Sequence, residues 1–312
     1  MDVVTFGETM VLFHPSSAVP LRFAGQFEKT IGGAESNVAI ALSRLGHQAG
    51  WISRLGNDDF GIYVRNFIRG EGVDTSRVVF DQTRSTAIFF KGKRTEQEPK
   101  VYYYRSGSAA SRMSPEDLDE DYLSKAKYLH VTGITPALSD SCRDLVFHAI
   151  AMAKRHGVMV VFDPNIRLKL WSKEQAKETL MEIASRCDIV LPGIEEGILM
   201  TGKSQPEEVA RMLLKNGSKA VVVKLGAEGA YYDNGSERGY IEGFPVSRMV
   251  DPIGAGDGFA AGFLSGLLRG WTYQEAVRLG NRVGAYAVTV SGDVEGYPYF
   301  EQIIRDNEEI LR

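Results

Sequence analysis

Short apolar runs alternate with longer amphipathic segments from residue 128 onward. The short runs are typical of buried strands, and the longer segments carry apolar residues at helical spacing. The predicted strands and helices are, in chain order, 128–131, 139–156, 158–163, 172–186, 189–191, 206–216 and 221–225. This order is typical of a parallel sheet with helices on both faces.

The N-terminal part predicts further elements of the same kind. Apolar strands are expected at 3–6 and 49–54, with helices at 38–45 and 60–69. Near the other end, Asn234-Gly235 between two strand-like runs predicts an antiparallel hairpin. After residue 257 the pattern is mostly helical.

Two segments do not fit this alternation. Residues 9–31 are turn-rich and strand-like, and residues 81–107 contain two aromatic, β-branched runs joined by a charged link at 91–100. The second segment predicts a hairpin, and together the two segments predict a small sheet over the core. We therefore expect an α/β core, consisting of residues 1–8, 32–80 and 108–312, and a discontinuous β lid, consisting of residues 9–31 and 81–107.

Composition narrows the function classes. The chain has 312 residues, of which 44% are hydrophobic, and its net charge of −4 argues against nucleic acid as a partner. It has only Cys142 and Cys187, which suits a reducing compartment. No basic-apolar leader precedes the first strand, and no apolar run is long enough to span a bilayer. We expect a cytoplasmic protein with no membrane partner.

The stretch from Asp251 to Leu264 predicts a turn, a loop of small residues and a helix. The N–H groups of Gly254, Ala255 and Gly256 can converge at the helix start, where they favour an anion. Asp257 in the same turn has two interpretations. It is either a helix N-cap or a general base that takes a proton from an attacking hydroxyl group.

Residues 197–204 match the phosphate-binding P-loop pattern, but a different structure is expected there. Residues 198–200 are typical of one apolar helix face, and Ser204 with Pro206 and Glu207 predicts a helix capping box. We therefore exclude a P-loop.

The 251–264 stretch resembles the second signature of the ribokinase-like (PfkB) carbohydrate kinases, and Gly32-Gly33-Ala34-Glu35-Ser36-Asn37 resembles the first. Glu35 departs from the pattern, because many members have proline or a small residue there. The resemblance covers essentially the whole chain. It implies a ribokinase-like, doubly wound, mainly parallel sheet with a β-sheet lid, and ATP with Mg²⁺ as cofactors.

The resemblance also implies roles for individual residues. Asp257 would be the catalytic base, assisted by the amides of Gly254, Ala255 and Gly256. The sugar would lie near Gly33, Ala34, Asn37, Phe89, Tyr103, Arg105, Arg167 and Asp257. The ATP site would comprise Asn165, Arg167, Lys224, Gly226, Gly229, Gly254, Gly256 and Asn281. Glu196 would help to place Mg²⁺, although Gly193 stands where the family motif has asparagine, and Asp251 would lie near a monovalent cation such as K⁺.

Two arginines indicate the substrate class. Arg105 ends the lid hairpin, and Arg167 follows the predicted strand 158–163. If both arginines face one cavity, they suit a carboxylate, because a guanidinium group binds it through two hydrogen bonds. With Tyr103, these segments resemble the family branch that phosphorylates 2-keto-3-deoxygluconate, a sugar acid. The gluconate and galactonate epimers are not distinguished.

Two other functions remain open from the sequence. One is a kinase of a neutral sugar such as fructose or ribose on the same fold, and the other is a non-catalytic sugar-binding regulator. A dimer or larger homo-oligomer is expected, because aromatic lid strands with free edges can pair with another copy.

Overall fold

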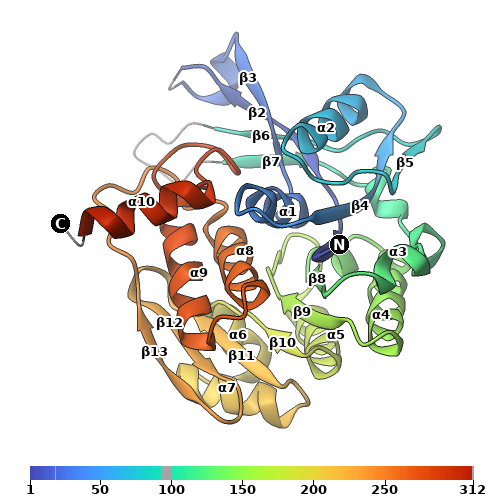
Figure 1. Cartoon of the computed structure of the whole chain (residues 1–312). Coiled ribbons are helices and arrows are strands. Elements are labelled where there is room, and N and C mark those ends of the chain that lie inside the picture. The colour runs from blue at the N-terminus through green and yellow to red at the C-terminus, as the bar shows by residue number, and fades with distance from the viewer. Residues whose placement is uncertain (18, 93–99, 311–312) are drawn as a thin grey trace.

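The computed structural model describes residues 1–17, 19–92 and 100–310. Its larger sheet is built from β1 (Val3–Phe6), β4 (Ala49–Gly56), β5 (Val78–Asp81), β8 (Tyr128–Thr132), β9 (Met159–Asp163), β10 (Ile189–Val190), β11 (Ala220–Lys224), β12 (Gly229–Asp233) and β13 (Arg238–Glu242). The strand order is β13-β12-β11-β10-β9-β8-β1-β4-β5 (Figure 1). All neighbouring strands are parallel except the β11-β12 and β12-β13 pairs at one edge.

Helices cover both faces of this sheet, and each face has its own apolar core. The helices that contribute to one core are α1 (Ala34–Arg44), α2 (Asp59–Gly70), α8 (Ala255–Leu268), α9 (Tyr273–Ala287) and α10 (Phe300–Ile310). The helices that contribute to the other are α3 (Glu120–Ser124), α4 (Asp140–Arg155), α5 (Lys173–Arg186), α6 (Ile194–Thr201) and α7 (Pro206–Lys215). Short 3₁₀ helices occupy Leu21–Phe23, Ala110–Arg112, Pro115–Asp117, Thr135–Ala137 and Gly226–Glu228. The central strands are buried on both sides, which explains their continuous valine and isoleucine runs.

A second, smaller sheet has the order β3-β2-β6-β7. Its strands are β2 (Met10–Pro15), β3 (Phe27–Gly32), β6 (Ile88–Lys91) and β7 (Val101–Tyr104). In Figure 1 it lies above α1, at the top of the view. The β6-β7 hairpin and its separation from the main sheet are as the sequence predicts. The division into core and lid with the boundaries given above remains a prediction.

The topology predicts where a ligand binds. The chain forms β1, β4 and β5 on one side and then crosses to β8 on the other side of β1, so the winding direction reverses between β1 and β8. In open α/β sheets, ligands bind beyond the carboxyl ends of the strands at such a point. Glu8, Gly133 and Asp163 lie at or just beyond the ends of β1, β8 and β9.

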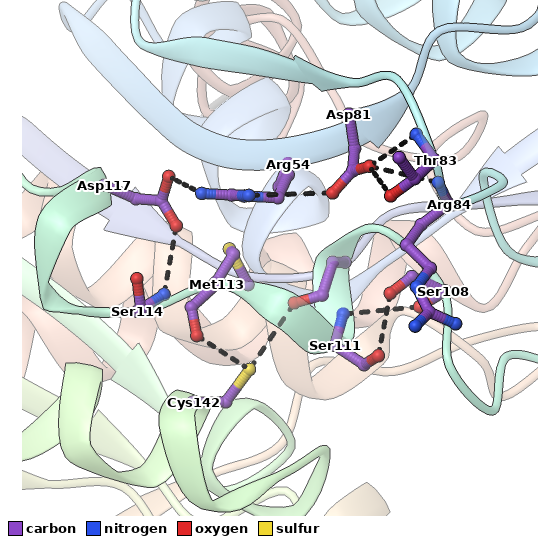
Figure 2. Close-up of polar contacts among 11 residues, drawn as sticks. Arg54, Asp81, Thr83, Arg84, Ser108, Ser111, Met113, Ser114, Asp117 and Cys142 are labelled. Carbon is purple, nitrogen blue, oxygen red and sulfur yellow. Dashed lines mark hydrogen bonds and ion pairs between the residues drawn. The ribbon is translucent and has the colours of Figure 1, made fainter.

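The segment that leads from β7 back to the core is fixed by polar contacts (Figure 2). Arg54 of β4 forms ion pairs with Asp81, at 3.6 Å, and with Asp117, at 2.7 Å. The buried Cys142 thiol of α4 donates to the carbonyl groups of Ala110 and Met113. These contacts hold residues 108–117 against the large sheet, and the position of the adjacent hairpin end depends on them.

Two local predictions are wrong. Lys91 was assigned to the charged link, but it is the last residue of β6 and its side chain is buried. Ser204 was expected to cap α7, but the N-cap residue is Gln205, without a side-chain hydrogen bond. The excluded P-loop is helix α6, as expected. Among the described residues, no helix has the length and apolar character needed to cross a membrane.

Candidate active site

Two cavities meet at the N-terminus of α8. The first, of about 410 Å³, lies between the carboxyl ends of the central strands and the small sheet, and the second, of about 550 Å³, lies between the β11–β13 edge and α8 and α9. Both are lined by Lys224, Pro252 and Gly256. A ligand in one cavity can therefore reach a ligand in the other across this loop.

The loop owes its shape to glycine. Gly254, the N-cap residue of α8, has a φ of +81°, and a Cβ atom there would lie 2.5 Å from the carbonyl oxygen of Asp293. Only glycine fits without strain. The following residues, Ala255, Gly256 and Asp257, form the first helical turn, whose N–H groups have no partner within the helix. These N–H groups could therefore bind an anion, and that role remains a prediction.

Asp257 lies in the first cavity, and its side chain is held by two asparagines. Asn37 of α1 donates to Oδ2 at 2.8 Å, and Asn165 donates to Oδ1 at 3.3 Å. Asn165 has a φ of +37°, which is unusual for a residue other than glycine. Burial raises the pKa of Asp257 to about 7, and the nearby Asp163 contributes in the same direction, against the hydrogen bond from Asn37. This value suits a base that must accept and release a proton near neutral pH.

Lys224 ends β11 at the junction of the two cavities. Its ammonium group donates to Oδ2 of Asp163 at 2.7 Å, while Oδ1 of Asp163 is buried without a partner. The carboxylate of Glu196 accepts the N–H groups of Ile166, at 2.8 Å, and Gly193, at 2.7 Å. Burial is the main cause of the raised pKa of Glu196. Glu196 faces the cavity and is not part of a solvated helix face.

The two arginines differ in their surroundings. Arg105 forms an ion pair with Glu8, whose side chain is fully buried, and Ser108 donates to the same carboxylate at 2.6 Å. Arg167 lines the cavity, and its guanidinium group is exposed. Of the pair expected to hold a carboxylate, Arg167 is available and Arg105 is already neutralised.

The remaining predicted sugar-site residues also line the first cavity. They are Gly33, Ala34, Asn37, Phe89 and Tyr103. The rings of Phe89 and Tyr103, on neighbouring strands of the small sheet, stack with centroids 5.5 Å apart. The small sheet therefore supplies an aromatic wall.

The second cavity is largely apolar, as a site for a nucleobase would be. The predicted residues Gly226, Gly229 and Asn281 line it. Asn281 donates to the carbonyl groups of Ile241 and Glu242, so it holds the end of β13. Sequence reasoning missed one wall of this cavity, formed by Phe244, Pro245, Val246 and Met249.

Asp251 is not open for a bound cation. Its Oδ1 accepts the N–H of Ile253 at 3.2 Å, and its Oδ2 is paired with Lys91 from the small sheet. The buried carboxylate of Asp293 lies nearby. Burial raises its pKa to about 7, against the opposing effect of Lys91. Sequence reasoning did not identify Lys91 or Asp293, because neither belongs to a motif of the family.

An anion-binding loop that joins two cavities, with a carboxylate placed as a base, is the arrangement of a phosphotransferase. Comparison with known proteins agrees. The model of the pfkB family of carbohydrate kinases matches residues 1–298. A 2-dehydro-3-deoxygluconokinase (a synonym of 2-keto-3-deoxygluconate kinase) from Bacillus subtilis (strain 168) is 43% identical over 305 residues, which are 97% of this chain and 94% of that protein.

Solved structures show the same fold over nearly the whole chain. A PfkB protein from Polaromonas sp. JS666 is 45% identical, with a TM-score of 0.90 over 97% of this chain and 99% of that one. A putative ribokinase II from E. coli, solved in complex with ATP and Mg²⁺, is 28% identical, with a TM-score of 0.91 over 99% of each chain. The chain therefore belongs to the PfkB family of carbohydrate kinases, which are phosphotransferases with the ribokinase-like fold.

Proposed function

We propose that the enzyme transfers the γ-phosphoryl group of ATP to the primary hydroxyl of 2-keto-3-deoxygluconate and so produces the 6-phosphate. One observation carries the proposal. The buried Asp257 carboxylate lies in the polar cavity beside the glycine loop that this cavity shares with the apolar one. A sugar acid in the first cavity and ATP in the second would place the hydroxyl, the phosphoryl group and the base together.

Asp257 accepts the proton of the attacking hydroxyl in the proposed reaction. The N–H groups of residues 254–257 stabilise negative charge on the phosphoryl oxygens, and the ammonium group of Lys224 adds to this field. Asn37 and Asn165 orient the carboxylate through their hydrogen bonds. The small sheet covers the sugar and excludes water, which would otherwise accept the phosphoryl group.

Mg²⁺ fits the carboxylates between β9 and α6. Oδ1 of Asp163 has no partner, and Glu196 faces the same cavity, so the two could hold the ion together with water and phosphate. When bound, Mg²⁺ would neutralise charge on the transferred group. No side-chain donor exists at Gly193, so Glu196 holds its position through backbone N–H groups.

The sugar-acid assignment depends on Arg167, which projects into the first cavity without an ion-pair partner among the described residues. The ion pair of Arg105 with Glu8 favours an alternative, because a single free arginine holds a carboxylate less firmly than two. A kinase of a neutral sugar such as fructose is therefore the second candidate.

A coupled ATPase assay separates the candidates. Turnover is measured with 2-keto-3-deoxygluconate, 2-keto-3-deoxygalactonate and fructose for the wild type, for Arg167→Ala and for the control Arg186→Ala, which changes an exposed arginine on α5. We expect a higher KM for the sugar acids in Arg167→Ala only, by roughly 10- to 100-fold, as for loss of a charged hydrogen bond. An unchanged KM in Arg167→Ala would show that Arg167 does not bind the substrate carboxylate. Faster turnover of fructose than of the sugar acids by the wild type would support the neutral-sugar kinase.

We also propose self-association through the small sheet. Its edge strands β3 and β7 pair with no further strand among the described residues, and Phe27, Tyr102 and Tyr104 on them are exposed. Exposed aromatic edge strands pair readily with a second copy. Light scattering on the wild type and on Tyr102→Lys/Tyr104→Lys should show a dimer that the substitutions dissociate.

A further inference from the structure

A buried ion pair joins the small sheet to the glycine loop. Lys91 is the last residue of β6, and Asp251 stands three residues before the N-cap residue Gly254. Each side chain is only 10% exposed, and the ammonium group lies on Oδ2 of the carboxylate. Oδ1 of the same carboxylate accepts the N–H of Ile253 and so shapes the turn that enters the loop.

A second buried carboxylate increases the need for positive charge at this point. Asp293 is 8% exposed, and its Oδ1 has no hydrogen-bond partner. Its backbone carbonyl packs directly against Gly254. Asp251, Asp293 and Glu295 would give the base of the loop a negative field, which opposes the binding of phosphate at the N-terminus of α8. Lys91 and, less strongly, Arg167 offset this field at Asp293.

A bound monovalent cation, which the family resemblance implied at Asp251, does not fit these residues. The ammonium group of Lys91 already lies on the carboxylate oxygen that faces away from the turn. A lysine ammonium group carries the same single charge as K⁺ and is a compact donor.

We propose that Lys91 is a positioning residue that supplies this charge from within the chain, so that the enzyme binds ATP independently of K⁺. The proposal rests on the proposed use of ATP. It implies that the glycine loop acquires its phosphate-binding shape only when the small sheet contributes β6. Removal of the ammonium group should create a requirement for an external cation.

The test measures MgATP affinity by isothermal titration calorimetry, in KCl and in tetramethylammonium chloride at equal ionic strength. The proteins are the wild type, Lys91→Met and the control Lys100→Met, which changes an exposed lysine just before β7, across the hairpin from Lys91. We expect equal affinity in both salts for the wild type and the control. We expect Lys91→Met to bind ATP roughly 10- to 100-fold more weakly in tetramethylammonium, as for loss of one charged interaction, and to regain affinity in KCl.

Three results would overturn the proposal. They are a wild type that needs K⁺, a Lys91→Met variant with wild-type affinity in tetramethylammonium, and a weakened variant that does not respond to K⁺. Lys91→Met leaves a buried carboxylate unpaired, which opposes folding, so a second variant, Lys91→Met/Asp251→Asn, removes both charges together. The double variant should bind ATP equally in the two salts, and a K⁺ response in it would refute the pairing.

The same experiment keeps this proposal separate from the proposed function. If the wild type binds no ATP in either salt, the proposed nucleotide is wrong. If it binds ATP but phosphorylates no sugar acid, only the substrate assignment fails. In that second case the comparison of salts still decides the role of Lys91.

Discussion

Replacement of Asp257 by asparagine removes the proposed base while keeping its shape and hydrogen bonds. Asn37 and Asn165 both donate to the aspartate oxygens, so the new amide nitrogen meets one donor. Oδ1 of Asn37 is buried without a partner. A flip of the Asn37 amide would let this oxygen accept from the new nitrogen, so we expect the site to keep its geometry.

The expected loss of activity follows from the role of the group. A positioned general base contributes about 10²- to 10⁴-fold to the rate, so kcat should fall by that factor. In the wild type the base must be ionised, and burial raises its pKa to about 7. The value of kcat/KM should therefore fall by about tenfold for each pH unit below 7 and level off above it. In Asp257→Asn this acidic limb should disappear.

The Asp257→Asn substitution should raise the stability of the protein while it lowers the activity. The folded-state pKa of Asp257 is raised from 3.8 to about 7, so the folded protein holds a proton that the unfolded chain releases. The contribution of Asp257 to the free energy of unfolding is therefore largest below pH 4 and is lost as the pH rises to 7. At pH 8 the buried charge costs up to about 4 kcal/mol. Asparagine avoids this cost, so Tm at pH 8 should rise by several degrees.

The assay combines coupled turnover between pH 5.5 and 9 with calorimetric melting at pH 5 and pH 8. Asp121→Asn, an exposed aspartate on α3, is the matched control and should change neither quantity. Loss of activity with a lower Tm would mean that Asp257 is structural. Turnover at the wild-type rate with an intact acidic limb would refute the general base.

Four further substitutions test other parts of the site. Gly256→Ala should weaken ATP binding with little change in Tm, since its Cβ would lie 3.6 Å from Nζ of Lys224. Gly254→Ala should lower Tm strongly, because its φ is positive and its Cβ would clash with the carbonyl oxygen of Asp293, and equal melting points would contradict this contrast. Arg105→Ala should lower the free energy of unfolding by roughly 3–5 kcal/mol in denaturant titration, because Glu8 becomes a buried unpaired charge, and an unchanged midpoint would show that Glu8 finds another partner. Glu196→Gln should raise the Mg²⁺ concentration for half-maximal turnover severalfold. An unchanged Mg²⁺ concentration would show that Glu196 does not bind the metal.

The fold could be predicted because local pattern and tertiary structure agree. The apolar runs at 128–131 and 158–163 are strands, and the intervening segment at 139–156 is a helix that differs from α4 by one residue at each end. The order of strands in the sheet could not be derived from these patterns, because it depends on contacts between segments far apart in the chain. Predictions of local structure failed where the structure depends on a contact between side chains far apart in the sequence. The burial of Lys91, for example, depends on a partner 160 residues away.

Parts of the candidate site could likewise be predicted from local sequence, and parts could not. Glycine loops and acidic residues within one motif could be found, because the chemistry depends on neighbours in sequence. The ion pair between Glu8 and Arg105 could not, since it joins the end of β1 to the end of the hairpin. Which residues line a cavity likewise depends on contacts between segments far apart in the chain. For this reason the sequence did not predict the apolar wall at 244–249.

Contacts between the small sheet and the core are concentrated on loops that line the first cavity. Arg105 pairs with Glu8 after β1, Lys91 pairs with Asp251 before the glycine loop, and Thr30 of β3 donates to Glu295 at 2.8 Å. Each contact satisfies a carboxylate of the core with a donor from the small sheet or its hairpin end. Movement of the small sheet would therefore expose these charges and change the field at the phosphate loop. Under the proposed function, sugar binding beneath the sheet and phosphate binding at α8 should accordingly be coupled through charge, in addition to the contact between the two ligands.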